Sequence, residues 1–132
     1  MTVSEHPEHW SLLDEPLVLD SLRFDFAVTF VVGINADRLE LRVEESLVLT
    51  DPAGDRHEVD PEGDPALLAP LLRLLRLDVK RLDAFKDGRL ELEFVTGDLV
   101  TVAPSRKYEA WGIVGEGGRR FMSVPGGELA VW

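Results

Sequence analysis

Cysteine is absent from the chain. The protein therefore has no disulfide framework and no thiol nucleophile, which fits a reducing cytosol. The length of 132 residues predicts one domain. A chain of this size buries roughly two-thirds of its unfolded surface on folding, so it needs neither disulfides nor a metal ion to hold a core together.

Long hydrophobic runs are also missing. The longest apolar stretch, residues 66–75, is interrupted by Pro70 and Arg73. It falls well short of the ~20 apolar residues that a transmembrane helix needs. The N-terminal residues include Glu5 and Glu8 where a signal peptide would carry basic residues. We therefore expect a cytoplasmic protein with no membrane partner.

Acidic residues are in clear excess, and the formal net charge is −11. Residues 1–65 hold 16 acidic against 4 basic residues, whereas residues 66–132 hold 9 against 10. A field of this sign repels nucleic acid phosphates and anionic membranes, so we expect neither as a partner. The acidic half either attracts a basic protein surface or only keeps a small domain soluble, and the sequence leaves both interpretations open.

Alternating hydrophobicity predicts the strands of the first half. From Leu22 to Val32 every second residue is apolar, which predicts one long strand with a single buried face. Turn residues follow, and the alternation resumes in residues 39–43, where we predict a second strand. Residues 47–49 extend that strand beyond a bulge. The acidic residues 51–65, rich in Pro and Gly, predict a loop.

Residues 65–76 predict one short Leu-rich helix. Asp64 is a suitable N-cap, and Pro65 fits the first helical position. Pro70 removes a backbone donor from the interior of this segment. The segment is therefore expected to form either one helix or two turns packed on the sheet.

Residues 77–132 alternate between short apolar strands and turn sequences such as Asp87–Gly88. Together with the first half, they predict an α+β domain that is predominantly an antiparallel β-sheet. We expect seven or eight strands in a hairpin meander. Residues 1–15 are predicted to form a loosely ordered N-terminal segment, and residues 16–132 a single β-rich domain.

Two elements of the chain resemble a family of small actinobacterial proteins of unknown function. One is Tyr108–Glu109–Ala110–Trp111, and the other is the closing Pro125–Gly126–Gly127 followed by Leu129–Ala130–Val131–Trp132. The resemblance covers the last hairpins well and the first half only by strand pattern. It implies no activity, cofactor or catalytic residue. Proteins of this kind sometimes serve as immunity proteins beside secreted toxins, which is an association and not an inference from these residues.

Tyr108, Glu109 and Trp111 form the sharpest candidate binding cluster. In a strand from Tyr108 to Val114, Glu109 and Trp111 share one face, and Tyr108 lies on the other. A carboxylate beside an indole can receive a cation or a partner's arginine. The structural alternative places Trp111 in the core and pairs Glu109 with one of three arginines, Arg106, Arg119 or Arg120.

No set of residues has the spacing of a catalytic or metal centre. Glu109 has no second carboxylate at an identifiable spacing for acid–base chemistry, and the serines lack the surroundings of an activated nucleophile. His6 and His9 approach a metal-ligand spacing but have no third ligand. The acidic residues 51–64 do not follow the calcium-loop pattern. We therefore expect no enzymatic activity, no cofactor and no bound metal.

Non-catalytic protein interaction is the function that these features favour. An acidic face that includes Glu40, Glu44 and Glu58 would bind a basic protein partner, and an immunity-type role is one form of this hypothesis. One alternative is a small-ligand pocket beside the Tyr-Glu-Ala-Trp element. Another is a structural homodimer formed through exposed strand edges, with the C-terminal strand as the candidate edge.

Overall fold

The computed structural model describes residues 3–132, apart from the side chain of Glu116. Its thirteen strands form one continuous antiparallel sheet. The strands are β1 (Ser4–Glu5), β2 (His9–Ser11), β3 (Leu17–Phe24), β4 (Val28–Val32), β5 (Leu39–Val43), β6 (Leu47–Thr50), β7 (Arg56–Val59), β8 (Asp78–Phe85), β9 (Leu90–Phe94), β10 (Leu99–Val102), β11 (Trp111–Gly115), β12 (Arg120–Val124) and β13 (Glu128–Val131). Three 3-10 segments accompany them: η1 (Asn35–Asp37), η2 (Pro65–Leu74) and η3 (Glu116–Gly118).

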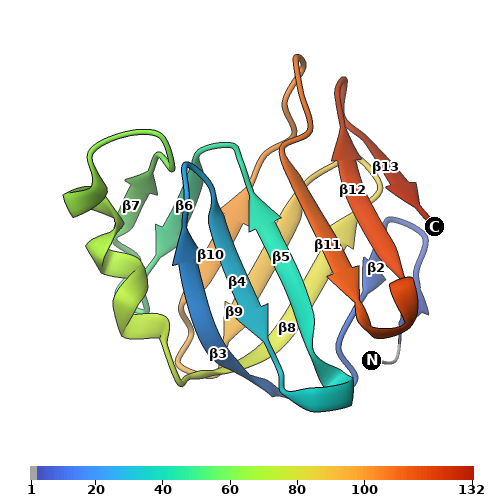
Figure 1. The fold of residues 1–132 in the computed structure, drawn as a ribbon, viewed down its shortest axis with the longest axis horizontal. Helices are drawn as coiled ribbons and strands as arrows, with labels where there is room; N and C mark the ends of the chain where they lie inside the picture. The colour runs from blue at the N-terminus through green and yellow to red at the C-terminus, as the bar shows by residue number, and fades with distance from the viewer. Residues whose placement is uncertain (1–2) are drawn as a thin grey trace.

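The sheet folds over on itself into two packed layers (Figure 1). One layer has the order β13-β12-β11-β5-β4-β3, and the other has the order β8-β9-β10-β6-β7. Strand β3 joins them, because Leu17 and Val18 pair with β8 while the rest of the strand pairs with β4. The structure is thus a β-sandwich whose apolar core lies between the two inner faces.

The predominantly antiparallel sheet with one sizeable helix is confirmed, but the expected seven or eight strands and the simple meander are wrong. The chain crosses between layers after β5 and after β10, and β11 pairs with β5 instead of β10. The loop predicted for residues 51–65 contains β7, which pairs with β6 through the turn at Asp51–Asp55. Its composition is polar because β7 is an edge strand with one exposed face.

The period-two pattern correctly identifies the buried face of most strands. In β5, Leu39, Leu41 and Val43 are buried while the residues between them are partly exposed, and β9 repeats this pattern. The buried apolar residues of the strands join one core cluster, which also includes three leucines of η2. This continuous core supplies the burial that a domain without disulfides needs.

The single strand predicted from Leu22 to Val32 is instead a hairpin of β3 and β4. The turn at residues 25–27 contains neither Gly nor Pro, and Phe26 adopts a left-handed backbone conformation with φ of 64°. The apolar alternation continues across this turn because Phe24 pairs with Val28, in register. The sequence pattern therefore hides the turn, and this loop brings Phe26 to the surface.

Residues 3–15, which the sequence predicted to be loosely ordered, carry β1 and β2. Strand β2 pairs with β8, and Trp10 packs edge-on against Phe121 with ring centroids 5.6 Å apart. Leu12 is fully buried. The segment is held by this apolar burial and by its backbone pairing with β8. Residues 1–2 of the predicted loose segment lie outside the described residues.

The Leu-rich segment forms η2, with the predicted N-cap: the Asp64 carboxylate accepts a hydrogen bond from the backbone of Ala66. Its buried residues, Leu68, Leu71 and Leu74, recur every third residue. This spacing matches the three residues per turn of a 3-10 helix, which aligns all three on the side facing the core. None of the helices in the described part of the chain is long and apolar enough to cross a membrane.

Two turns and one loop meet closely around Gly88. A Cβ atom on Gly88 would lie 2.9 Å from the Pro104 side chain, 3.0 Å from the Ser123 hydroxyl and 3.1 Å from the backbone of Gly127. Gly88 also has φ of 93°, which disfavours any side chain. The Asp87–Gly88 turn is therefore packed directly on the Pro-Gly-Gly turn between β12 and β13.

Gly88→Ala and Gly126→Ala form a matched pair that separates packing from backbone strain. Both glycines have positive φ, 93° and 97°, but a Cβ on Gly126 meets nothing within 4 Å. We expect Gly126→Ala to lower the free energy of unfolding by about 1–2 kcal/mol. Gly88→Ala should cost about 1–3 kcal/mol more, because the added methyl overpacks the contact. Urea denaturation measures both, and equal losses would contradict the packing role.

Candidate functional site

Trp111 is a core residue. Its side chain is 1% exposed, and its indole nitrogen donates a 2.8 Å hydrogen bond to the Gly88 carbonyl. Strand β11 begins only at Trp111, so the strand predicted from Tyr108 is wrong for its first three residues. Tyr108 and Glu109 lie instead in an exposed loop. The predicted shared face of Glu109 and Trp111 is therefore not formed.

The loop that carries Tyr108 is fastened at both ends. The Ser105 carbonyl accepts a 3.0 Å hydrogen bond from the Gly126 backbone. At the other end, the buried Ala110 carbonyl accepts hydrogen bonds from the backbone of Glu44 and Glu45, at 2.9 and 3.2 Å. Tyr108 therefore has a defined position next to the turn between β5 and β6.

Tyr108 lies among carboxylates. Its hydroxyl donates a 3.2 Å hydrogen bond to Glu45, and the side chain is 45% exposed. The hydrogen bond to Glu45 and the charge of that residue raise the pKa of Tyr108, and the charges of Glu62 and Asp60 raise it further. Ionising the phenol would place another negative charge in this field, so the neutral form is favoured.

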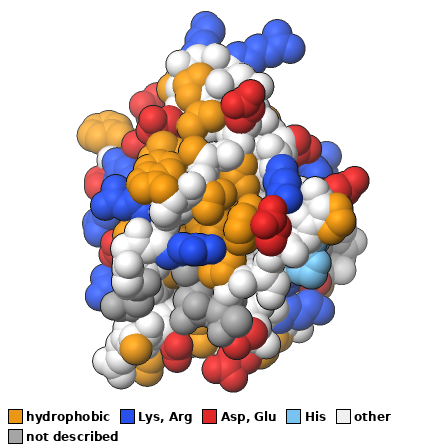
Figure 2. Space-filling model, turned by 90° about the vertical axis from the view of Figure 1, so that its right-hand side faces the viewer, with side chains coloured by type: hydrophobic (Ala, Val, Ile, Leu, Met, Phe, Trp, Pro, Cys, Tyr) orange, Lys and Arg blue, Asp and Glu red, His pale blue; other side chains and the backbone are white. Residues whose placement is uncertain are grey.

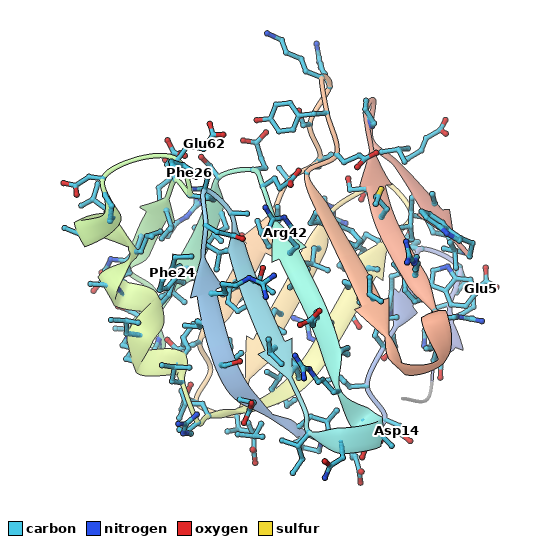
Figure 3. The ribbon with its side chains drawn as sticks, viewed as in Figure 1. Glu5, Asp14, Phe24, Phe26, Arg42 and Glu62 are labelled. Carbon is cyan, nitrogen blue, oxygen red and sulfur yellow. The ribbon has the colours of Figure 1, made fainter. Side chains whose placement is uncertain are left out.

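Phe26 projects from the turn between β3 and β4 and is 80% exposed. It lines a surface hollow of about 360 Å³ together with Arg42, Glu44, Glu62 and Tyr108. We call these five residues the acidic rim. Figure 3 shows Phe26 and Glu62 at one end of the sandwich, with Asp14 at the opposite end. A bulky exposed aromatic in a left-handed conformation is uncommon, and such residues concentrate at functional sites.

The one cation of the rim is already paired. Arg42 donates hydrogen bonds to Asp25 at 3.0 and 3.2 Å and to Glu44 at 3.2 Å. The hydrogen bond to Glu44 contributes most to a raised pKa of Arg42, which Asp25 supports and partial burial opposes. Because its charge is matched by these two carboxylates, Arg42 does not offset Glu45 and Glu62. The rim therefore keeps an excess of negative charge.

A second hollow, of about 250 Å³, continues from Arg42 and Glu44 over the outer face of β11 and β12. Glu109 lines it beside Gly112 and Met122. Because Gly112 has no side chain, the space above it stays open. A Cβ atom at this position would lie 3.5 Å from the end of Met122, within contact distance. Of the predicted binding residues, Tyr108 lines the rim, whereas Glu109 and the almost fully buried Trp111 both line this second hollow.

The predicted acidic face is not one surface. Glu40 and Glu44 extend from β5 and its end on the outside of one layer, where they pair with Arg38 at 3.0 Å and Arg42 at 3.2 Å. Glu58 lies on β7 in the other layer, in a separate hollow of about 460 Å³. The outer faces of the two layers point in opposite directions, so these three carboxylates cannot bind one small patch of a partner. Of the three, only Glu44 belongs to the acidic rim.

Other charged side chains form a network of ion pairs on the second layer. On the outside of the second layer, Arg81 donates hydrogen bonds to Asp83, Glu91 and Glu93 at 2.8 to 2.9 Å. The hydrogen bond from Arg81 is the main reason why the pKa of Glu93 is lowered. Among residues 3–132, no three His, Asp or Glu side chains come together as a metal-ligand set. The rings of His6 and His9 stack, with centroids 4.6 Å apart.

Phe26, Arg42 and Glu62 are members of the rim that the sequence did not indicate. Phe26 falls within an unbroken period-two pattern, so it is indistinguishable from a buried strand residue. Arg42 and Glu62 look like ordinary solvated charges, and only the crossing of the chain between layers brings them together. Asp25 was the only local sign of the turn between β3 and β4, because Asp favours turns.

These features define an antiparallel β-sandwich with an acidic, aromatic rim at one end. Residues 15–132 match a family of unknown function, DUF6188, and the chain belongs to this family. No curated protein and no solved structure matches the chain. The resemblance to a family of unknown function is thus confirmed, while its actinobacterial origin and its motifs stay predictions.

Tyr108 is the only tyrosine of the protein, so its titration measures the field at the rim directly. We expect the tyrosinate absorbance to appear at a pH above the usual value of about 10. Glu45→Gln should shift the titration midpoint down, since the carboxylate that disfavours the phenolate is removed. Glu58→Gln removes the same charge without a hydrogen bond to Tyr108 and is the control. Identical midpoints for wild type and Glu45→Gln would contradict this geometry.

Proposed function

We propose that the protein is a non-catalytic, cytoplasmic interaction module that binds basic side chains of a protein partner at the acidic rim. The exposed Phe26 beside an excess of carboxylates is the observation that supports this most strongly. Aromatic rings and carboxylates together suit an arginine or a lysine, through cation–π and charge-assisted contacts. A secreted toxin with a basic surface, as in an immunity role, is one partner of this chemistry.

Two properties of the rim, together with the net charge of the chain, favour a protein over a small ligand. The hollow at the rim is open and its volume, about 360 Å³, is at the low end of the ~300–1,000 Å³ range of ligand pockets. Phe26 protrudes from the surface instead of lining an enclosed cavity, which is the form of an anchor that a partner receives. The −11 net charge also accelerates encounter with a basic partner.

Small-ligand binding beside Glu109 is the second candidate. The hollow there measures about 250 Å³ and combines one carboxylate with an apolar floor that includes Met122. A small organic cation fits this chemistry. The volume is below the usual range for ligand pockets, so we rank this function second.

The binding proposal predicts that charge reversal at the rim weakens binding of a short arginine-rich peptide. Glu62→Lys should raise the Kd by about 3-fold to 10-fold, because one attraction becomes a repulsion. Asp14→Lys makes the same charge change at the opposite end (Figure 3). Neither carboxylate forms an ion pair among the described residues, so the two variants are matched. Isothermal titration at low and moderate salt measures both affinities, and added salt should weaken binding.

An aromatic control separates docking at Phe26 from general attraction to an acidic protein. Phe26→Ser should also weaken binding of the peptide. Leu67→Ser removes another exposed apolar side chain, from η2, and should leave the affinity unchanged. Backbone amide shifts in an NMR titration should concentrate on the rim. Equal effects of Glu62→Lys and Asp14→Lys, or shifts that extend well beyond the rim, would refute the proposal.

A further inference from the structure

Strand β13 is an open edge of the sheet. The sheet has two ends, β13 and β7, and a side branch that ends at β1. Helix η2 lies beside β7 (Figure 1). Strand β1 has only two residues, of which Glu5 is charged, and short, charged edges resist pairing. Strand β13 has neither protection: it has four residues, contains no Pro or Lys, and carries a single charge, on Glu128.

The backbone groups that β13 offers can be identified from its pairing with β12. Arg120 and Trp132 exchange two hydrogen bonds, of 2.7 and 3.0 Å, so they form a hydrogen-bonded pair of the antiparallel ladder. Such pairs alternate along the ladder. Ala130 and Glu128 therefore also face β12. The N–H and C=O groups of Leu129 and Val131 point the other way, and within residues 3–132 they have no partner.

We propose that β13 pairs with β13 of a second copy of this chain, antiparallel and with Ala130 on the twofold axis. This register places Leu129 opposite Val131 of the second copy, and Val131 opposite Leu129. Both residues of each such pair offer outward backbone groups, so the two pairs form four hydrogen bonds. When identical strands pair about a twofold axis, the open backbone groups of each edge bond to those of the other. Most dimers have this isologous arrangement, in which both copies use the same surface.

The side chains in this register are compatible on both faces of the joined sheet. Ala130 meets Ala130 on the outer face, where directly opposed Cβ atoms approach closely and small residues fit. On the inner face, Leu129 and Val131 are only partly buried, as is Trp10, which packs on Phe121 of β12. Figure 2 shows hydrophobic side chains gathered at the centre of this side of the molecule. A second copy covers part of this apolar surface.

Charge complementarity favours a second copy over an unrelated strand. Arg120 pairs with Trp132 across β12 and β13, and in the joined sheet Trp132 stands opposite Glu128 of the second copy. Arg120 and Glu128 of the second copy therefore share one cross-strand row on the outer face, twice by symmetry, two strands apart (roughly 10 Å) with Trp132 between them. In the single chain they stand four residues apart along the ladder, roughly 13 Å, and neither has an ion-pair partner in the described part of the chain.

Sedimentation velocity on the full chain, over a range of concentrations, tests this dimer. A strand pair of this length buries little area, so we expect a Kd in the roughly micromolar range. Ala130→Lys places two like charges on the twofold axis and should abolish the dimer. Val114→Lys puts the same charge on the same outer face, two strands from the edge, at an exposed position. It should leave the dimer intact.

A charge swap tests the register itself. Arg120→Glu and Glu128→Arg should each raise the Kd about 2-fold at low salt, since each turns two symmetric long-range attractions between exposed charges into repulsions. The double variant should restore the wild-type value, because the pairs are re-formed between chains. A protein that stays monomeric at every concentration overturns the proposal. So does a dimer that Ala130→Lys leaves unchanged, or a double variant no tighter than the single ones.

Discussion

The buried hydrogen bond between the Trp111 indole and the Gly88 carbonyl joins the two layers of the sandwich. Trp111 starts β11 in one layer, and Gly88 forms the turn between β8 and β9 in the other. A buried carbonyl without its donor costs about 1–3 kcal/mol, so this contact holds the two layers together at this point. It also requires glycine at position 88, because Pro104 and the Ser123 hydroxyl leave no space for a side chain.

The position of the acidic rim follows from this contact. Pro104 packs on Gly88, so the crossing from β10 to β11 leaves the core at a fixed point. Its other end is held by the Ala110 carbonyl, and Tyr108 is therefore presented beside Glu45. A surface fixed in this way loses little conformational entropy on binding, which favours affinity without a deep pocket. The same residues that seal the core thus orient the exposed ones.

Local patterns in the sequence predicted what depends on neighbouring residues and failed where distant segments meet. The buried alternation of β5 and β9, the N-cap Asp64 and the Asp87–Gly88 turn follow from short-range chemistry, and all are present. The turn at Phe26 was missed because a Phe occupies a conformation that usually signals Gly or Asn. The crossing that pairs β11 with β5 has no local signature at all. Tyr108 and Glu109 were recognised as surface candidates, and the structural alternative that placed Trp111 in the core is confirmed, because the alternation of β11 buries Trp111 together with Ile113.

The acidic rim and the open edge of β13 lie on different sides of the sandwich (Figures 1 and 3). Pairing through β13 therefore leaves both rims of the resulting dimer exposed. Two rims held at a fixed spacing can engage a partner that carries two basic patches, and the second contact then forms within the complex. Such avidity compensates for exposed ion pairs that are individually weak. In a protein whose charged contacts lie at the surface, self-association would thus turn a shallow acidic site into a selective one, because only a partner with the matching spacing gains the second contact.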